Sequence, residues 1–499
     1  RCNNEIVWIE PWGRDALRVR ACKQSQMPEE AWALENKGEF AAEIEAGPEG
    51  GYIRNGKLTA KVSRAGALSF VNQKGELLLE EYFRNRRDIT SPKCSALDVG
   101  AREFKPILGG DYTLAAHFEY DPREKLYGMG QYQQPYLDLK GCELELAQRN
   151  SQASVPFLLS SKGYGFLWNN PAVGSVTFGK NVTTWRAQST KVLDYWITAG
   201  DTPAEIEESY ASVTGTVPMM PDYGMGFWQC KLRYQTQDEL LNIAREYKKR
   251  GLPISVIVVD FFHWPYEGEW KFDPEYWPDP DAMVRELKEM GIELMVSIWP
   301  NPTNCPQTKD FERRGFMLPR SVYDAFNPLA RARYWEYANG EFFGNGFDAW
   351  WCDCTEPLDA DWRPMSEGYG WDSHEERWKG NLALLDGVLG AERSSLFSLY
   401  HSKGLYENQR ATTDRKRVVN LTRSSYAGQQ RYSTITWNGD THASWKSFAQ
   451  QIPQGLNFMA TGCPYWTVDI GSFFTRKGRE WFRAGDFDAG VDDMGYREY

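Results

Sequence analysis

An acidic residue at the end of a buried, aromatic segment is the first candidate for chemistry in this sequence. Asp353 follows the apolar run Ala349-Trp350-Trp351-Cys352, and Pro357 interrupts the regular backbone shortly afterwards. An unpaired buried carboxylate costs roughly several kcal/mol unless its surroundings stabilise it or use it. Asp353 is therefore a candidate site residue. The alternative is that Asp353 only caps a helix that follows the strand.

A second carboxylate occupies a comparable place farther along the chain. Asp440 closes the segment Trp437-Asn438-Gly439-Asp440, which follows another predicted strand. An Asx-type turn is the alternative role, because Asn-Gly-Asp favours such turns. If both acids line one pocket ringed by aromatic side chains, they could supply the two carboxyl groups of glycoside hydrolysis.

The sequence offers little to other chemistries. Its 5 His and 9 Cys form no cluster with metal-ligand spacing, no phosphate loop is present, and Gly128-Met129-Gly130 stops short of a dinucleotide fingerprint. We therefore expect no metal and no other cofactor. The cysteines show no disulfide framework, which favours reduced thiols and slightly favours a cytoplasmic location.

Composition narrows the class of ligand. The net charge of −11 over 499 residues argues against a nucleic-acid partner, and no apolar run approaches the roughly 18 residues of a membrane span. The chain has 21 Trp, 26 Tyr and 25 Phe. Because the C–H faces of sugar rings stack on aromatic planes, an oligosaccharide or glycoside is the favoured partner. Composition indicates no oligomeric state.

Two patterns of secondary structure divide the chain. Residues 1–215 read as short alternating segments with frequent turn signals, for example at 56–62, 67–71 and 164–168, which predicts an amino-terminal β-sandwich. From residue 216 apolar strand-like runs alternate with helices at 238–250 and 281–290. The predicted strands are 226–230, 254–260, 292–300, 348–353, 418–423, 433–437 and 456–461.

This alternation predicts an α/β fold, with a (β/α)8 TIM-type barrel over 216–499 and a doubly wound sheet as the alternative. About seven strands are counted, so we expect the last β/α unit to be missing from this chain. Charged or aromatic residues lie at the ends of several predicted strands or just after them, which predicts that these residues meet at one barrel mouth. These residues are Asp260, Trp299, Asp353, Arg423, Asp440 and Asp469. Strand alternation further predicts that Trp351 points inward with Asp353, and that Cys352 and Cys354 point outward.

Three segments resemble motifs of glycoside hydrolase family 31, the retaining α-glucosidase and α-xylosidase family. The segment 350–357 resembles the nucleophile motif and places the nucleophile at Asp353. Residues 423–432, followed by 437–440, resemble the acid/base motif and place the acid/base at Asp440. The segment 465–471 resembles the motif after the seventh strand. Members of the family also carry an eighth strand with a sugar-binding His and C-terminal β-domains, so the resemblance implies a truncated chain or, as the alternative, a site that another chain completes.

The resemblance also implies the residues that bind the sugar. It places Asp260, Trp299, Trp351, Arg423, Trp437 and Asp469 around the −1 subsite. Arg423 could keep Asp353 ionised or bind sugar hydroxyls, and a structural salt bridge is its alternative role.

The segments 231–234, 260–264 and 268–270 resemble the α-xylosidase branch, in which a bulky Phe261 or Trp299 would exclude a 6-hydroxymethyl group. The expected activity is therefore release of terminal α-xylose through a covalent glycosyl-enzyme. α-Glucosidase and α-galactosidase are alternatives, and a catalytically silent carbohydrate-binding protein is the alternative of another class.

Overall fold

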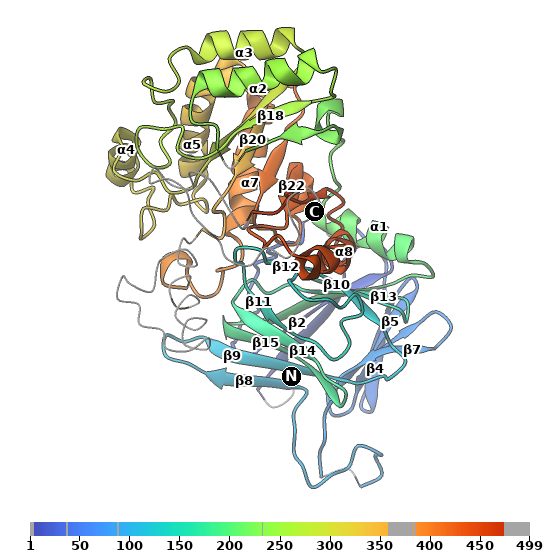
Figure 1. Cartoon of the computed structure of the whole chain (residues 1–499). Helices are drawn as coiled ribbons and strands as arrows, with labels where there is room; N and C mark the ends of the chain where they lie inside the picture. Colours follow the sequence, from blue (N-terminus) through green and yellow to red (C-terminus); the bar gives the residue numbers. More distant parts are fainter. Residues whose placement is uncertain are drawn as a thin grey trace.

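The computed structural model describes residues 4–473 except 36–37, 87–88, 232, 358–382 and 384–385. Antiparallel sheets form one part of the molecule, and a parallel sheet with helices forms the other (Figure 1). No helix in the described ranges is long and apolar enough to cross a membrane.

The amino-terminal part contains three antiparallel sheets. The first has the order β1 (Ile6–Pro11), β2 (Ala16–Cys22), β16 (Leu193–Ala199), β13 (Tyr164–Trp168), β12 (Ala153–Ser160), β10 (Leu126–Gln131). The second has the order β11 (Glu143–Leu146), β14 (Gly174–Phe178), β15 (Val182–Thr190), β9 (Tyr112–Glu119), β8 (Arg102–Pro106). The third has the order β3 (Glu43–Gly47), β4 (Gly50–Asn55), β5 (Leu58–Ser63), β6 (Leu68–Asn72), β7 (Leu77–Glu80).

One apolar core joins these sheets. Alternate residues of β2, namely Leu17, Val19 and Ala21, are fully buried in a cluster with Trp185 of β15 and Phe70 of β6. Burial of a Leu, Val or Phe side chain contributes about 1.5–3 kcal/mol. Alternate residues of β2 thus face this core, as the pleat of a strand requires, and the sandwich prediction is confirmed.

The second part begins after α1 (Pro203–Thr214), which packs on β13 and β16. Its strands are β17 (Trp228–Gln229), β18 (Val256–Val259), β19 (Glu293–Ile298), β20 (Ala349–Cys352), β21 (Asn420–Thr422), β22 (Thr434–Trp437) and β23 (Trp466–Thr467). The α-helices are α2 (Gln237–Lys249), α3 (Pro280–Glu289), α4 (Pro306–Arg314), α5 (Pro328–Glu341), α7 (Phe397–Thr412) and α8 (Trp445–Met459). Short 3-10 helices are η1 (Asp222–Met225), η2 (Phe343–Asn345) and η4 (Gln429–Tyr432).

The strands β17 to β23 pair in sequence order, and every pair is parallel. Along β18, Val256 and Val258 join the interior cluster of the barrel, whereas Ile257 and Val259 join the core beneath the helices. A strand buried on both faces favours apolar residues at successive positions, which explains the continuous apolar run of β18.

One predicted strand is wrong. Residues 456–461 contain the last turn of α8, and the seventh strand is β23 instead. Ser444 caps the start of this helix by accepting the Ser447 N–H at 3.2 Å, and the Thr461 hydroxyl donates to the Phe458 carbonyl near its end at 2.6 Å. A short apolar run does not by itself distinguish a strand from the buried part of a helix.

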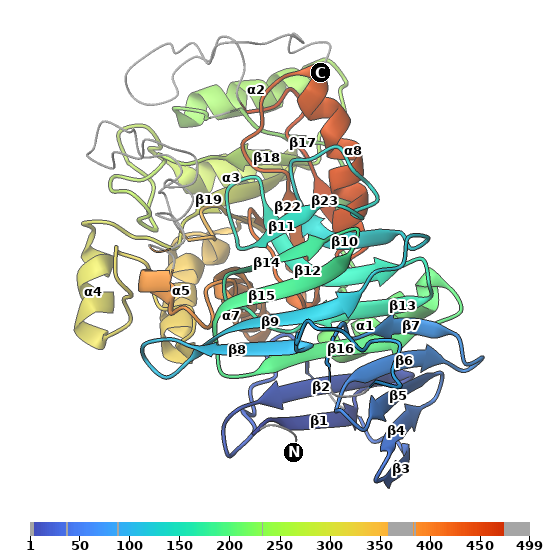
Figure 2. The same ribbon diagram turned by 90° about the horizontal axis from the view of Figure 1, so that it is seen from below.

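Hydrogen bonds join the sandwich to the last strands of the barrel, where β10 lies beside α8 (Figure 2). Gln131 at the end of β10 donates to the Trp437 carbonyl at 3.0 Å and accepts the Trp466 indole N–H at 2.9 Å. The Gly128 N–H donates to Asn457 Oδ1 of α8 at 3.0 Å. These bonds position loops of the sandwich beside the carboxyl ends of β22 and β23.

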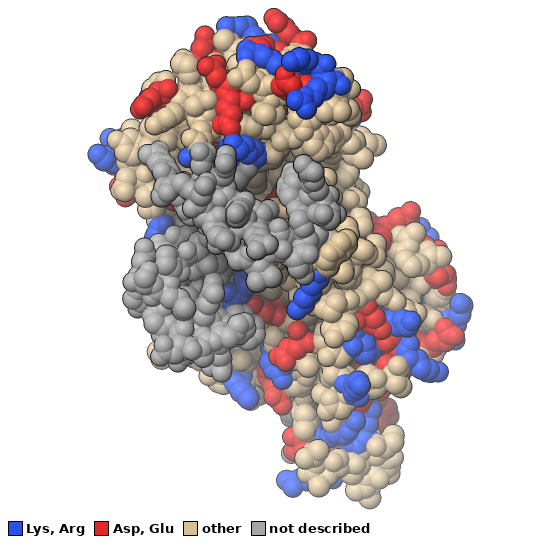
Figure 3. Space-filling view, viewed as in Figure 1, with Lys and Arg blue, Asp and Glu red and all other residues tan. Residues whose placement is uncertain are grey.

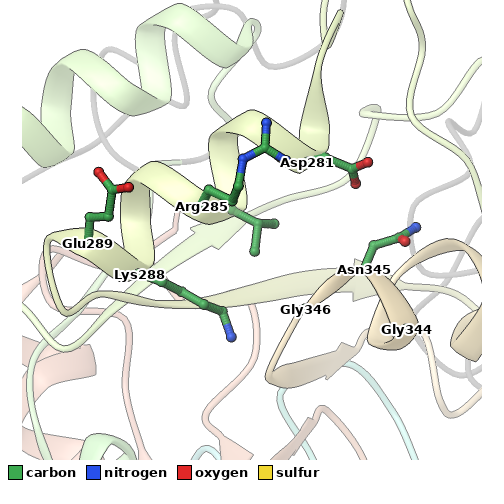
Figure 4. A pocket seen from close by; sticks show the side chains of 8 residues that line it. Asp281, Arg285, Lys288, Glu289, Gly344, Asn345 and Gly346 are labelled. Atoms are coloured by element: carbon green, nitrogen blue, oxygen red, sulfur yellow. The ribbon is translucent and has the colours of Figure 1, made fainter.

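Charges of both signs are interspersed over α2 and α3 on the face shown in Figure 3. Arg245 of α2 and Glu286 of α3 form one such pair at 2.6 Å. A surface hollow lies between α3 and the turn that precedes β20 (Figure 4). It is lined by Asp281, Val284, Arg285, Lys288, Glu289, Gly344, Asn345 and Gly346. None of the predicted site residues lines this hollow.

Candidate active site

Six neighbouring strands each carry a predicted site residue at or just beyond their carboxyl ends. In strand order from β18 to β23 these residues are Asp260, Trp299, Asp353, Arg423, Asp440 and Asp469. Because the strands are parallel, these ends lie at the same edge of the sheet, where barrel enzymes carry their catalytic groups. Trp351 within β20 and Trp437 at the end of β22 complete the predicted set.

Arg423 joins the two candidate catalytic acids. Its Nη1 atom lies 3.1 Å from Asp353 Oδ1 and 3.3 Å from Asp440 Oδ2. The two carboxyl oxygens are therefore no farther apart than the sum of these distances, about 6.4 Å. The structure thus brings Asp353 and Asp440 to one place, although the sequence separates them by a whole βα unit.

A third acid, which no sequence pattern indicated, fixes the orientation of Arg423. Arg423 Nε donates to Glu356 Oε1 at 2.8 Å, and Arg423 Nη2 donates to Glu356 Oε2 at 3.0 Å. Both side chains are 3 % exposed. A bidentate pair of this kind sets the plane of the guanidinium. Arg423 is consequently both a buried salt-bridge residue and the partner of the two aspartates.

The backbone turns sharply just after Asp353. Cys354 adopts a left-handed conformation with φ of 56°, and its N–H donates to Asp353 Oδ1 at 2.7 Å. This turn interrupts the strand alternation, so Cys354 Sγ lies 3.4 Å from Arg423 Nη2. The prediction that Cys354 faces the helices is wrong. Cys352 does lie in the core under the helices, and Trp351 packs at the barrel interior, as predicted.

Burial and mutual repulsion raise the pKa values of the clustered acids. Burial raises the pKa of Asp353, Arg423 opposes this rise, and Glu356 adds to it. Burial also raises the pKa of Asp440 to about 6, against the stabilising effect of Arg423 on its ionised form. A carboxyl group with a pKa near 6 can exchange its proton close to neutral pH, as a general acid/base must.

Two further acids belong to the same electrostatic neighbourhood. Burial raises the pKa of Asp469 to about 7, and the charges of Asp440 and Asp353 contribute to this rise. The pKa of Asp260 is also raised well above its usual value, first by burial and then by the charges of Asp353, Asp469 and Asp440. Within the described residues, no group of three or more His, Cys, Asp or Glu side chains is arranged to hold a metal ion.

Aromatic side chains border these acids. The rings of Trp351 and Trp437 meet edge to face at 5.5 Å, and the ring of Phe261 stacks on Trp299 at 5.8 Å. Trp264 meets Trp299 edge to face at 5.4 Å. The buried indole N–H groups of Trp299, Trp351 and Trp437 have no hydrogen-bond partner among the described residues. Apolar aromatic walls of this kind suit a ligand that presents C–H faces.

A loop of the sandwich also reaches the site. Asn150 Oδ1 accepts the Asp440 backbone N–H at 3.0 Å, and Asn150 Nδ2 donates to Asp440 Oδ2. The Ser151 hydroxyl donates to the Asp440 carbonyl at 3.1 Å. No local pattern indicates a contact between residues 290 positions apart, so sequence reasoning had no signal for it.

This combination of a barrel mouth, paired carboxylates on one cation and aromatic walls defines the class of glycoside hydrolases. Comparison with known families gives the particular one. The model of the "Glycosyl hydrolases family 31 TIM-barrel domain" matches residues 217–488. The model of the "Glycosyl hydrolase 31 N-terminal galactose mutarotase-like domain" matches residues 7–176. The chain belongs to glycosyl hydrolase family 31, as the sequence motifs predicted, and the predicted fold class is confirmed.

Several relatives match over long stretches. An uncharacterized family 31 glucosidase of Pseudescherichia vulneris is 44% identical over 530 residues, covering 100% of this chain and 97% of the relative. An α-xylosidase of Saccharolobus solfataricus is 36% identical, with 73% of this chain and 50% of the relative covered. A crystal structure of a family 31 α-xylosidase from a soil metagenome, complexed with xylose, is 44% identical with a TM-score of 0.86. It covers 94% of this chain, which spans 71% of that protein.

Proposed function

We propose that the protein is a retaining α-glycosidase that releases a terminal α-linked sugar, α-xylose above all. Asp353 is the nucleophile and Asp440 the acid/base in this proposal. The observation that carries it is the contact of both carboxyl groups with the same nitrogen of Arg423. We further propose that residues 1–215 form the sandwich domain and 216–499 the catalytic domain.

The spacing of the acids favours retention over inversion. Retaining glycosidases hold the two carboxyl groups about 5–5.5 Å apart, whereas inverting enzymes need about 6.5–9.5 Å to admit a water molecule. The limit of about 6.4 Å between Asp353 Oδ1 and Asp440 Oδ2 lies below the inverting range. A double displacement through a covalent intermediate fits this space better than direct attack by water.

In the first step a carboxylate oxygen of Asp353 attacks the anomeric carbon while the bond to the leaving oxygen breaks. Asp440 gives its proton to that oxygen, so the departing group leaves as a neutral alcohol. In the second step Asp440 takes a proton from water, the water oxygen attacks the anomeric carbon, and the ester to Asp353 breaks. Arg423 stabilises the ionised form of Asp353, which keeps it a nucleophile.

The remaining predicted residues are proposed to bind the sugar. Asp260, Asp469, Trp351, Trp437, Trp299 and Arg423 would line the −1 subsite, the aspartates accepting hydrogen bonds from hydroxyl groups. The Phe261–Trp299–Trp264 contacts form a packed aromatic wall beside Asp260. Such a wall suits a pentose, because the 6-hydroxymethyl group of glucose or galactose would have to displace it.

Two kinds of relative support xylose as the sugar: α-xylosidases of Saccharolobus solfataricus and Aspergillus niger, and the xylose-bound soil-metagenome structure. The chain spans 50% of the first of these enzymes and 68% of the second. α-Glucosidase or α-galactosidase activity is the alternative within the family. A silent carbohydrate-binding protein would bind the same sugars without turnover.

The test is turnover of a panel of 4-nitrophenyl α-glycosides by the chain, with Asp353→Ala and the exposed-residue control Asp222→Ala. We expect the α-xyloside to have the highest kcat/KM, Asp353→Ala to lose at least about 10³-fold in kcat, and the control to match wild type. Sugar binding by calorimetry without turnover of any glycoside would favour the silent binding protein. Asp353→Ala with a tenth or more of wild-type kcat would refute its role as nucleophile.

A further inference from the structure

The loop that brings the sandwich to Asp440 has a defined shape. It joins β11 to β12 and turns between Arg149 and Gln152, whose backbones exchange two hydrogen bonds of 3.1 and 3.0 Å. Asn150 and Ser151 form the tip of this turn. Ser151 has φ of 65°, a strained conformation for a residue with a side chain, which persists only where neighbouring contacts hold it.

Those contacts are with the loop that carries Asp440. Asn150 Oδ1 accepts the Asp440 N–H at 3.0 Å, and the Ser151 hydroxyl donates to the Asp440 carbonyl at 3.1 Å. Gly439 has φ of 71°, and a Cβ atom there would lie 2.5 Å from the Ser151 backbone nitrogen. Glycine at 439 therefore lets the two loops approach more closely than any other residue would.

This network fixes the direction of the Asn150 amide. Since Oδ1 accepts the Asp440 N–H at 3.0 Å, Nδ2 is the group that faces Asp440 Oδ2. Arg423 Nη1 also donates to Oδ2, at 3.3 Å. Both side-chain donors that reach this carboxyl group within the described residues therefore bind the same oxygen.

We propose that Asn150 is a positioning residue that holds Asp440 with Oδ2 as hydrogen-bond acceptor and Oδ1 as the oxygen that carries the proton to the leaving group. This inference rests on the proposed function, in which Asp440 is the acid/base. It makes the sandwich a working part of the catalytic site, because the donor comes from the β11–β12 loop.

The surrounding charges make the role measurable. Arg423 and Asn150 both lower the pKa of Asp440 by stabilising its ionised form, while Asp353 and Glu356 raise it. Asp469 and Asp260 complete the charged groups that interact with this neighbourhood. Removal of Asn150 leaves all the charges in place and removes one donor, so the pKa of Asp440 should rise.

The experiment compares Asn150→Ala with Asn72→Ala. Asn72 is a matched control, because it ends β6 beside a turn of the sandwich, donates to a carboxylate (Glu76, 2.8 Å) and accepts a backbone N–H (Lys74, 3.0 Å). kcat/KM would be measured against pH for an α-glycoside with a poor leaving group and for its 4-nitrophenyl analogue. If Asn150→Ala does not fold, as judged by circular dichroism, the isosteric Asn150→Asp replaces it, with the same expected directions.

We expect Asn150→Ala to lose about 10–100-fold in kcat/KM for the poor leaving group and less than about threefold for 4-nitrophenol, which needs little protonation. The alkaline limb of its pH profile should move up by about one pH unit. Asn72→Ala should show neither change. Equal losses on both substrates with an unmoved limb would overturn the inference.

Asp440→Ala, measured on the same two substrates, separates failure of the inference from failure of the proposed function. If Asp440→Ala discriminates strongly against the poor leaving group while Asn150→Ala does not, the positioning role of Asn150 is wrong. If Asp440→Ala does not discriminate at all, the acid/base assignment itself is wrong and the inference falls with it.

Discussion

Glu356→Gln isolates the effect of the third carboxylate on the catalytic pair. Glutamine keeps the volume of glutamate and one acceptor oxygen for Arg423, but it removes a buried negative charge. That charge raises the pKa values of both Asp353 and Asp440. Without it the ionised forms of both aspartates become less costly, so both pKa values should fall.

The expected size of the two pKa shifts depends on Arg423, which contacts Glu356 as well as both aspartates. A charge within about 4–6 Å shifts a pKa by about 1–3 units, and partial neutralisation of Glu356 by Arg423 reduces this to about one unit, or about 1.4 kcal/mol. In the proposed mechanism the acid limb of the kcat/KM profile reports Asp353 and the alkaline limb reports Asp440, so the whole pH profile should move to lower pH by about one unit.

The assay is kcat/KM for the preferred 4-nitrophenyl α-glycoside in small pH steps, together with a thermal melt. Glu81→Gln is the matched control, because Glu81 is another buried carboxylate paired with an arginine, Arg102, at 2.5 Å in the sandwich. It should lower the melting temperature and leave the pH profile in place. A Glu356→Gln profile that stays in place or moves to higher pH would refute the electrostatic reasoning.

Three further variants test other parts of the site. Asp469→Asn should raise the melting temperature at pH 8 and leave it unchanged below about pH 4. The folded-state pKa of Asp469, about 7, exceeds the ordinary aspartate value of 3.8, so the wild-type protein loses stability as the pH rises between these two values. Equal differences in melting temperature at both pH values would contradict this. Phe261→Ala should increase the kcat/KM of an α-glucoside relative to that of the α-xyloside by about tenfold or more, because one added group is worth about 10–200-fold in a fitted pocket. An unchanged ratio would show that the aromatic wall does not select the sugar. Gly439→Ala should reduce turnover at least as much as Asn150→Ala, because the new Cβ would lie 2.5 Å from the Ser151 nitrogen; wild-type turnover would show that the loop contact is dispensable.

The sequence predicts the part of the site that depends on local pattern. Asp260 and Asp353 each follow an apolar strand directly and Arg423 directly follows β21, and parallel pairing in sequence order then brings these three positions to the same edge of the sheet. Each strand pairs with the next strand along the chain, so the order of the βα units is enough to predict which strands are neighbours. The order of apolar runs and the acids that follow them therefore predict an α/β fold with two candidate acids, whereas the resemblance to family 31 was needed to assign their catalytic roles.

The rest depends on contacts or backbone angles that the sequence pattern does not report. Asn150 meets Asp440 only because the sandwich packs on β22 and β23. Cys354 turns toward Arg423 because its φ is positive, which strand alternation does not anticipate. The end of α8 resembles a strand in sequence, since a short apolar run satisfies both periodicities.

The most direct test of the central claim is identification of the residue that forms the covalent intermediate. A 5-fluoro α-xylosyl fluoride carries a good leaving group and forms a glycosyl ester that breaks down slowly. Mass spectrometry of the digested protein should find one added fluoroxylosyl group on the peptide containing Asp353, and none on that peptide in Asp353→Ala. A label on Asp440 or another residue would contradict the account, and so would rapid turnover of the reagent to the β-sugar without any label.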